Sequence, residues 1–153
     1  MIEMFKPKVI WHYGKTGTGK TYKAIKYCAK NNCRTYPFVQ RYEFNNLSEY
    51  LIVDLFDDYG DEDWEQVVRN TEHLCRPSDK KFKVINSHRY NPKVVIICSL
   101  LPPKRRLNLS NPIHKKLYDC IDEIYHCRER NHQPITTRDV DPERLEYIRV
   151  YDK

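Results

Sequence analysis

The sequence predicts an α/β fold with three layers, in which helices cover both faces of a central, mostly parallel β-sheet. Three observations lead to this class. Continuous apolar runs such as "KVVIICSLLPP" (93–103) are typical of strands buried on both faces. Segments with apolar residues at helical spacing alternate with these runs. A Gly-rich motif stands where the first strand would pass into the first helix. At 153 residues the chain has the length of one domain.

The first three elements are a strand, a loop and a helix. "KVIWHY" (8–13) is β-branched and aromatic, which indicates a short buried strand. "TYKAIKYCAKNN" (21–32) places Tyr22, Ile25, Cys28 and Ala29 at helical spacing. The loop between them fits G-x-x-x-x-G-K-[ST] at every fixed position.

This motif predicts a loop that binds nucleotide phosphates, with ATP and Mg²⁺ as cofactors. Its glycines let backbone N–H groups turn inward around phosphate oxygens. Lys20 is expected to reach the β- and γ-phosphates, and the Thr21 hydroxyl is expected to bind magnesium. The predicted nucleotide-binding residues are Gly14, Lys15, Thr16, Gly17, Thr18, Gly19, Lys20 and Thr21.

The next two strands lead to a group of acids. "CRTYPFV" (33–39) indicates a short strand, which Pro37 places near a sheet edge. "YLIVDLFDDYG" (50–60) indicates a stronger strand that ends in carboxylates. A phosphate loop requires a carboxylate at a strand end to hold magnesium. We expect Asp57 to be this ligand and Asp58 to orient the attacking water, with Asp54 as the alternative if the strand ends early.

Two helices and a tail complete the chain. "DWEQVVRNTEHLC" (63–75) has Trp64, Val67, Val68 and Leu74 on one helical face. "PIHKKLYDCIDEIYHC" (112–127) is apolar at Leu117, Ile121 and Ile124, and a strand is possible at "EIYHC". We therefore expect a domain over 1–130, followed by a polar appendage or tail over 131–153.

Composition excludes several classes of protein. Hydrophobic content of 40% and charged content of 31% are ordinary for a globular domain. No apolar run reaches the length of a membrane span, and the N-terminus lacks a secretory apolar region, so we expect a protein that is not secreted. The six cysteines form no C-x-x-C pair, which favours buried thiols in a reducing compartment.

The charge distribution points to nucleic acid. Net charge is +6, and the block from Lys80 to Lys116 contains no Asp or Glu. Such a block suits a phosphate backbone, although a solvated surface is the alternative. The interleaved Phe82, His88 and Tyr90 favour single strands, because rings beside cations stack on exposed bases.

Three blocks, "KPKVIWHYGKTGTGKTYKA", "LIVDLFDDYG" and "YNPKVVIICSLLPP", resemble in order and spacing the superfamily 3 helicase domain of replication initiator (Rep) proteins. These proteins come from circular single-stranded DNA viruses (circoviruses, nanoviruses, geminiviruses) and related plasmids. The likeness covers approximately residues 5–127. It implies a P-loop NTPase fold and an ATP-driven, magnesium-dependent DNA helicase. It further implies a homo-oligomeric ring, usually a hexamer, on single-stranded or forked DNA, located in the host nucleus for a eukaryotic virus and otherwise in the cytoplasm.

The resemblance carries several residues over. It assigns Lys20 and Thr21 to nucleotide and magnesium, and Asp57 and Asp58 to the Walker B acids. It implies that "KKFKVINSHRYNPK" (80–93) is the loop or hairpin that grips DNA, since Tyr90-Asn91-Pro92-Lys93 matches the family's "F-N-x-K". The Lys-Gly usual in that family is replaced by Val84-Ile85. The resemblance does not carry over the basic residues of this stretch one by one, and we expect its DNA contacts to be Lys81, Lys83, His88, Arg89 and Lys93.

Two departures from the family bear on catalysis. The family strand ends in "T-S-N", whose Asn senses the γ-phosphate, but this chain has Cys98-Ser99-Leu100. Either Ser99 partly substitutes or turnover is slow; a Leu100 that packs in the core is the alternative. The family also tends to place arginines before its final strand, where this chain has Asp119-Cys120. Arg105 and Arg106 are the nearest candidates for an arginine finger acting in trans, or else they are loop arginines on a solvated surface.

The family's N-terminal nicking domain is not expected here, because the chain has no His-x-His and the phosphate-loop motif begins too early. We therefore expect an excised helicase domain or a shortened relative. A nucleotide-dependent DNA-binding or assembly module with weak or no turnover is the alternative function. A small-molecule kinase is disfavoured by the basic block and by the lack of a recognisable lid.

Overall fold

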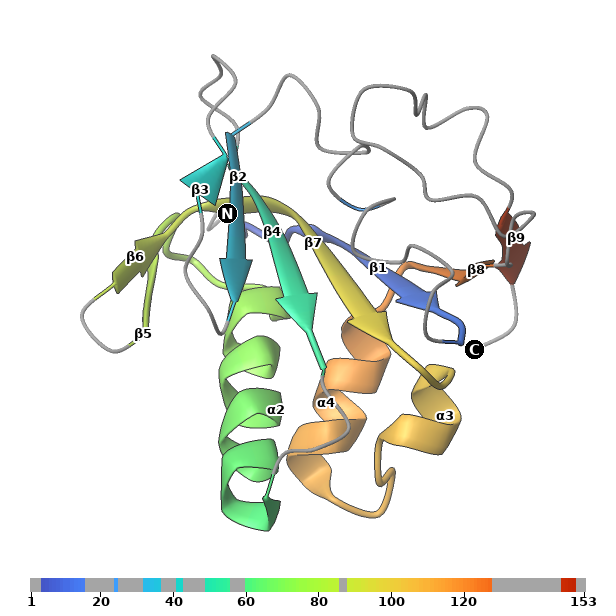
Figure 1. The fold of residues 1–153 in the computed structure, drawn as a ribbon. Helices are drawn as coiled ribbons and strands as arrows, with labels where there is room; N and C mark the ends of the chain where they lie inside the picture. The colour runs from blue at the N-terminus through green and yellow to red at the C-terminus, as the bar shows by residue number, and fades with distance from the viewer. Residues whose placement is uncertain are drawn as a thin grey trace.

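Seven strands form one sheet in the described part of the chain, which comprises residues 4–15, 24, 32–36, 41–42, 49–55, 60–85, 88–127 and 147–150 of the computed structural model (Figure 1). The strands of this sheet are β1 (Lys8–Tyr13), β2 (Asn32–Tyr36), β3 (Arg41–Tyr42), β4 (Glu49–Asp54), β7 (Pro92–Ser99), β8 (Glu123–Cys127) and β9 (Tyr147–Val150).

The sheet is mainly parallel. Its strand order is β3-β2-β4-β7-β1-β8-β9. The five inner strands β2, β4, β7, β1 and β8 pair in parallel, and the two edge strands β3 and β9 pair antiparallel to their neighbours. The expected α/β fold with a mainly parallel sheet is therefore confirmed.

Strand β7 shows why the apolar runs form inner strands. Every residue of β7 except Lys93 is buried. Because side chains alternate across a strand, Val95 and Ile97 join an apolar cluster on one face of the sheet, while Ile96 and Cys98 join a second cluster on the other. Each fully buried aliphatic side chain contributes about 1.5–3 kcal/mol to the apolar driving force. A strand without polar side chains in its interior is stable only where both faces of the sheet are buried.

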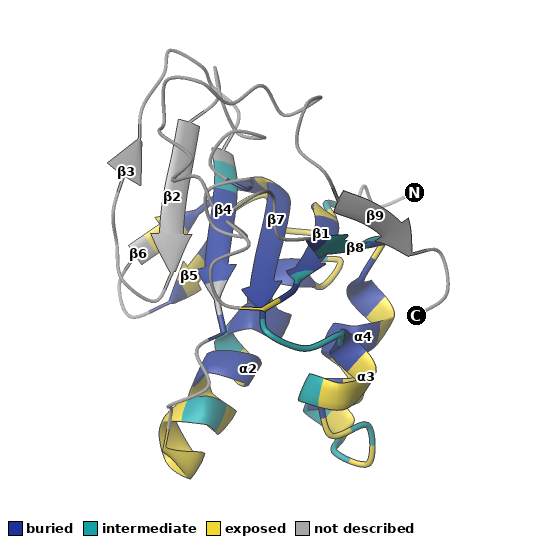
Figure 2. Cartoon of the chain, turned by 45° about the vertical axis from the view of Figure 1, so that its right-hand side comes forward, coloured by how far each residue is buried: buried dark blue, intermediate teal, exposed yellow. Residues whose placement is uncertain are grey.

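Two helices cover one face of the sheet, α2 (Asp61–Cys75) and α4 (Pro112–Cys120), and they also pack against each other (Figure 1). In α2 the apolar face is Val67, Val68 and Leu74, all buried, as the sequence predicted. The first turn of α2 is exposed (Figure 2) and carries three acids, which favour the positive end of the helix dipole.

The segment 112–127 contains both elements that the sequence allowed. Helix α4 ends at Cys120, and the strand option at "EIYHC" is confirmed as β8. Ile121 caps the helix, and Ile124 belongs to the buried face of β8 rather than to a helical stripe.

The opposite face of the sheet contacts Ala24. This residue is helical and fully buried, and it packs with Ile10, Ile52 and Ile96. The other residues of the helix expected over 21–32 lie outside the described residues. The chain therefore leaves β1 toward one face, whereas α2 and α4 lie on the other.

Two short elements connect to the sheet outside its main layers. A hairpin of β5 (Lys83–Ile85) and β6 (His88–Tyr90) lies between α2 and β7. Helix α3 (Pro103–Arg106) follows β7 and precedes α4. Strand β9 was not expected; it lies within the polar 131–153 segment and adds an edge to the sheet beside β8.

Candidate functional site

The carboxyl ends of three parallel strands meet at one edge of the sheet. Tyr13 ends β1 level with Ser99 at the end of β7, and Asp54 ends β4 level with Cys98. The backbone N–H of Gly14 donates to the Ser99 carbonyl at 3.2 Å, and Gly14 is buried. The first residue of the predicted phosphate loop is thus held against the end of β7.

Most of the predicted loop and two of the predicted acids lie outside the described residues. These are Thr16, Gly17, Thr18, Gly19, Lys20 and Thr21 of the loop, and Asp57 and Asp58. Lys15 is described and exposed.

The end of β4 answers one question that the sequence left open. Strand β4 ends at Asp54, and the N–H of the next residue, Leu55, donates to the Cys98 carbonyl of β7 at 2.9 Å. The side chain of Asp54 lies outside what the structure describes. The strand therefore ends early, which is the condition under which Asp54, rather than Asp57, was expected to hold the metal.

The turn after β7 is fixed by hydrogen bonds. Ser99 is 2% exposed, and its Oγ accepts the Leu101 N–H at 3.3 Å. The indole N–H of Trp11 donates to the Leu101 carbonyl at 3.0 Å. The Ser99 hydroxyl keeps its own proton to donate. Leu100, between the two anchored residues, is partly buried and offers no polar group beyond its backbone.

The arginines after β7 differ in their surroundings. Arg105 is exposed, whereas the Arg106 guanidinium lies over the Trp64 ring of α2, 3.6 Å from its centroid. A guanidinium in that position is attracted by the ring's electron-rich face. Arg105 is therefore the freer of the two to reach a neighbouring molecule.

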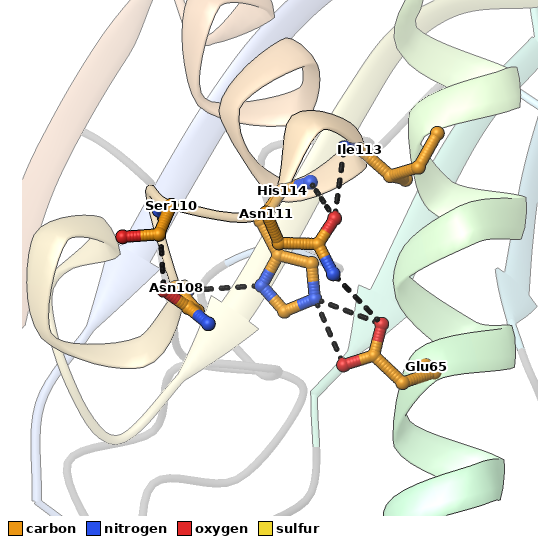
Figure 3. A network of polar contacts seen from close by, with 6 residues as sticks. All are labelled: Glu65, Asn108, Ser110, Asn111, Ile113 and His114. Carbon is orange, nitrogen blue, oxygen red and sulfur yellow. Dashed lines mark hydrogen bonds and ion pairs between the residues drawn. The ribbon is translucent and has the colours of Figure 1, made fainter.

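A polar network that was not anticipated from the sequence joins the segment 108–114, which leads into α4, to helix α2 (Figure 3). The buried His114 accepts the Asn108 N–H at Nδ1 (2.9 Å) and faces both carboxylate oxygens of Glu65 with Nε2 (3.2 Å). Since Nδ1 accepts, the proton of the neutral ring is assigned to Nε2, which donates to Glu65. Asn111 caps α4, because its Oδ1 accepts from the N–H groups of Ile113 (2.9 Å) and His114 (3.5 Å). The sequence signal was an Asn-Pro pair at the start of a helix.

The hairpin carries the predicted DNA-contacting segment. On its outer face Phe82 and Val84 are 45% and 56% exposed. The Arg89 guanidinium lies 4.3 Å and the Lys81 ammonium 5.9 Å from the centre of the Phe82 ring. Lys93 is exposed at the base of the hairpin, and the His88 side chain lies outside what the structure describes.

Lys83 occupies a different place from the one expected. Its side chain is only 4% exposed, and Nζ donates to the carbonyls of Leu74 (2.8 Å) and Arg76 (2.6 Å) where α2 ends. A cation there satisfies carbonyls that a helix end leaves open. Burial lowers the pKa of Lys83. Lys83 therefore does not lie on the exposed cationic face of the hairpin.

Four cysteines, Cys75, Cys98, Cys120 and Cys127, are buried and form no disulfide in the described part of the chain, as the composition predicted. Burial is the main cause that raises the pKa of the Cys75 and Cys120 thiols.

The described residues contain no cluster of three or more His, Cys, Asp or Glu placed for a metal ion, and no helix long and apolar enough to cross a membrane. In comparisons with known proteins, no protein-family model matches the chain and no curated protein matches it significantly.

Proposed function

We propose that the protein is a magnesium-dependent ATPase that acts on single-stranded DNA, as a helicase domain of the Rep type. The observation that carries this proposal is the position of Gly14. The strand before it, β1, continues toward the face that buries Ala24, whereas its neighbour β7 continues into α3 and α4 on the other face. In open parallel sheets, ligands bind at the carboxyl ends of two adjacent strands whose connections diverge in this way.

The strand order supports the same location. Strand β7 lies next to β1 and β4 lies beyond β7, so the backbones of Ser99 and Asp54 end at the same end of the sheet as the start of the phosphate-loop motif. An oxygen ligand for magnesium and a hydroxyl donor are the groups that a γ-phosphate requires. We assign the metal-binding carboxylate to Asp54, with Asp57 and Asp58 in the segment that follows.

The chain's own residues then divide the work. Lys20 and the loop N–H groups bind the phosphates, Thr21 and Asp54 hold the ion, and an acid from 54–58 orients the water. Bound Mg²⁺ supplies charge neutralisation between the β- and γ-phosphates. Arg105 serves a neighbouring protomer in a homo-oligomeric ring.

The hairpin is the proposed DNA surface. An exposed ring with two cations above it can stack on a base and pair with the adjoining phosphate. Phe82, Arg89 and Lys81 provide this arrangement, and Lys93 adds a cation at the hairpin base. We place the protein in the host nucleus if it derives from a eukaryotic virus, and otherwise in the cytoplasm.

Leu100 favours a second function. A hydrocarbon at the end of β7, where the Rep family has an amide, suits a module that binds ATP and DNA but hydrolyses slowly or not at all. In that case nucleotide would control assembly on DNA rather than translocation.

One experiment tests both functions. ATP hydrolysis is measured with and without single-stranded DNA for the wild type, for Lys20→Ala and for Lys116→Ala, which removes an equal charge from an exposed position on α4. We expect turnover that DNA stimulates in the wild type and the control, and none in Lys20→Ala. Turnover that survives Lys20→Ala refutes the assignment of ATP hydrolysis to the phosphate loop; ATP and DNA binding without turnover establishes the second function.

The DNA surface has its own test. The double variant Lys81→Gln/Arg89→Gln should bind single strands more weakly. The slope of its log affinity against log salt should be less negative by about 1.4, since each single-strand phosphate contact contributes about 0.7. A slope equal to that of Lys116→Gln would show that the hairpin is only a solvated surface.

A further inference from the structure

A pocket of about 550 Å³ opens where α2 ends and the chain turns toward β5. Polar residues His73, Arg76, Ser78, Asp79, Lys80 and Lys83 line it. Its volume lies within the ~300–1,000 Å³ typical of sites for small molecules, so it has room for a phosphate together with its sugar. The hairpin begins at the rim, since Lys83 both lines the pocket and opens β5.

The pocket contains the buried ammonium group of Lys83, whose positive charge is only partly compensated by its neighbours. Lys83 is buried, and two of its three N–H bonds go to backbone carbonyls at the end of α2, those of Leu74 and of the cap residue Arg76. Among the described residues no carboxylate lies within ion-pair distance of it and no acceptor takes its third N–H. Carbonyl dipoles compensate a buried ammonium only in part, and an anion would complete the compensation.

The remaining charged groups do not cancel this positive charge. Arg76, Lys80 and Lys83 are three cations against the carboxylates of Asp79 and of the neighbouring Glu72, which leaves one positive charge in excess. Arg76 also pairs with Glu72 at 2.8 Å, which orients the guanidinium. The Lys80 side chain is exposed, while its backbone N–H is held by the Ser78 Oγ at 3.1 Å.

We propose that this pocket binds a phosphate group of single-stranded nucleic acid, with Lys83 as the buried anchor and Lys80 as the exposed contact. This inference rests on the proposed DNA-binding function and extends it from the outer face of the hairpin to a second, concave site at the hairpin base. Phe82 lies between Lys80 and Lys83 in the chain, and the exposed Lys80 lines the pocket, so a strand that stacks on this ring would follow Lys80 to reach the pocket.

His73 provides a reporter inside the pocket. Burial, followed by the charges of Arg76 and Lys83, lowers the pKa of this imidazole from its ordinary 6.5. An anion bound among the same cations opposes their effect and raises the pKa. The ring titration is followed by NMR in the full chain without ATP, and the His73 signal is identified by its loss in His73→Gln.

Three arms separate the sources of phosphate: an oligothymidylate strand, inorganic phosphate, and chloride at equal ionic strength. We expect the strand to raise the His73 pKa at far lower phosphate-group concentration than inorganic phosphate does, and chloride to leave it unchanged. An effect of inorganic phosphate equal to that of the strand would assign the pocket to free phosphate and overturn the proposal. So would a His73 titration that the strand does not move.

Two variants localise the effect. Lys80→Gln should abolish most of the pKa rise and make the salt slope of strand binding less negative by about 0.7; Lys116→Gln should behave as the wild type. If Lys80→Gln also behaves as the wild type, the pocket is not the site. Because the titration contains no ATP, its result does not depend on whether the protein hydrolyses ATP. Conversely, a strand that binds through Arg89 without reaching His73 refutes the pocket alone.

Discussion

Leu100→Asn tests whether the end of β7 limits ATP turnover. The backbone at this position is fixed beside the proposed phosphate loop, because the Ser99 carbonyl accepts the Gly14 N–H and the Leu101 carbonyl accepts the Trp11 indole N–H. A side chain introduced at residue 100 is therefore attached to a backbone of fixed position at the end of β7. The amide of Asn can donate to a γ-phosphate oxygen or accept from the attacking water, whereas leucine can do neither.

The size of the effect follows from the kind of bond that is gained. A preorganised hydrogen bond that forms in the transition state is worth ~2.7–4 kcal/mol, or about a hundredfold to a thousandfold in rate. Leu100 is only partly buried, so an amide there keeps access to water and leaves no buried group unsatisfied. We expect kcat to rise by up to about a hundredfold, with ATP affinity unchanged, because the bond contributes only in the transition state.

The assay compares kcat for phosphate release, in the presence of single-stranded DNA, with the dissociation constant for ATP measured without turnover. Leu100→Ala is the matched control, since it removes the hydrocarbon without adding an amide. Equal kcat values for the Asn and Ala variants would refute the sensor argument. A large fall in the unfolding midpoint of both variants would show that Leu100 is a core residue and that the polar partner lies elsewhere.

Three further outcomes follow from the structure. Asp54→Asn should abolish magnesium-dependent turnover while Asp57→Asn retains part of it, since β4 ends at Asp54; the reverse result in the same ATPase assay would place the metal ligand three residues later. Asn111→Ala should cost about 1 kcal/mol of α4 capping, seen as a Tm lower by ~2–4 °C, and an unchanged Tm would contradict the cap. Burial and neighbouring cations lower the folded pKa of His73, so the unfolded chain binds this proton more tightly and the free energy of unfolding falls as the pH drops from above 6.5 through the lowered value. His73→Gln should show a smaller fall in urea denaturation over that range, and an equal fall would exclude this imidazole as the cause.

The sheet could be predicted because its signals are local. The apolar run of β7 and the helical face of α2 each identify an element without knowledge of its neighbours. The end of β4 could not be fixed in this way, since "VDLF" continues the apolar run beyond Asp54. The strand ends there because its pairing with β7 ends there, and pairing is a property of two segments that are distant in sequence.

The side-chain roles that sequence reasoning missed have the same origin. Lys83 belongs by composition to a basic block, yet its ammonium caps a helix that ends several residues earlier. His114 and Glu65 are 49 residues apart and meet only because α2 and α4 pack together. Strand β9 stands in a polar segment, and only the short alternation at 147–150 marked it. In each case the deciding partner comes from another part of the chain.

The position of β1 in the sheet has a consequence for how the chain is made. Lys8 pairs with Val94, 86 residues later, and Ile10 pairs with Glu123 on the other side. During synthesis the first strand therefore leaves the ribosome long before either of its neighbours exists, and its unpaired edges stay open to other chains meanwhile. Closing contacts over such distances also slows the final folding step, because the loop entropy is lost before the pairing energy is gained. A nascent chain that stops before residue 127 lacks a complete β8, which is one of the two neighbours of β1, and we expect it to aggregate rather than to fold.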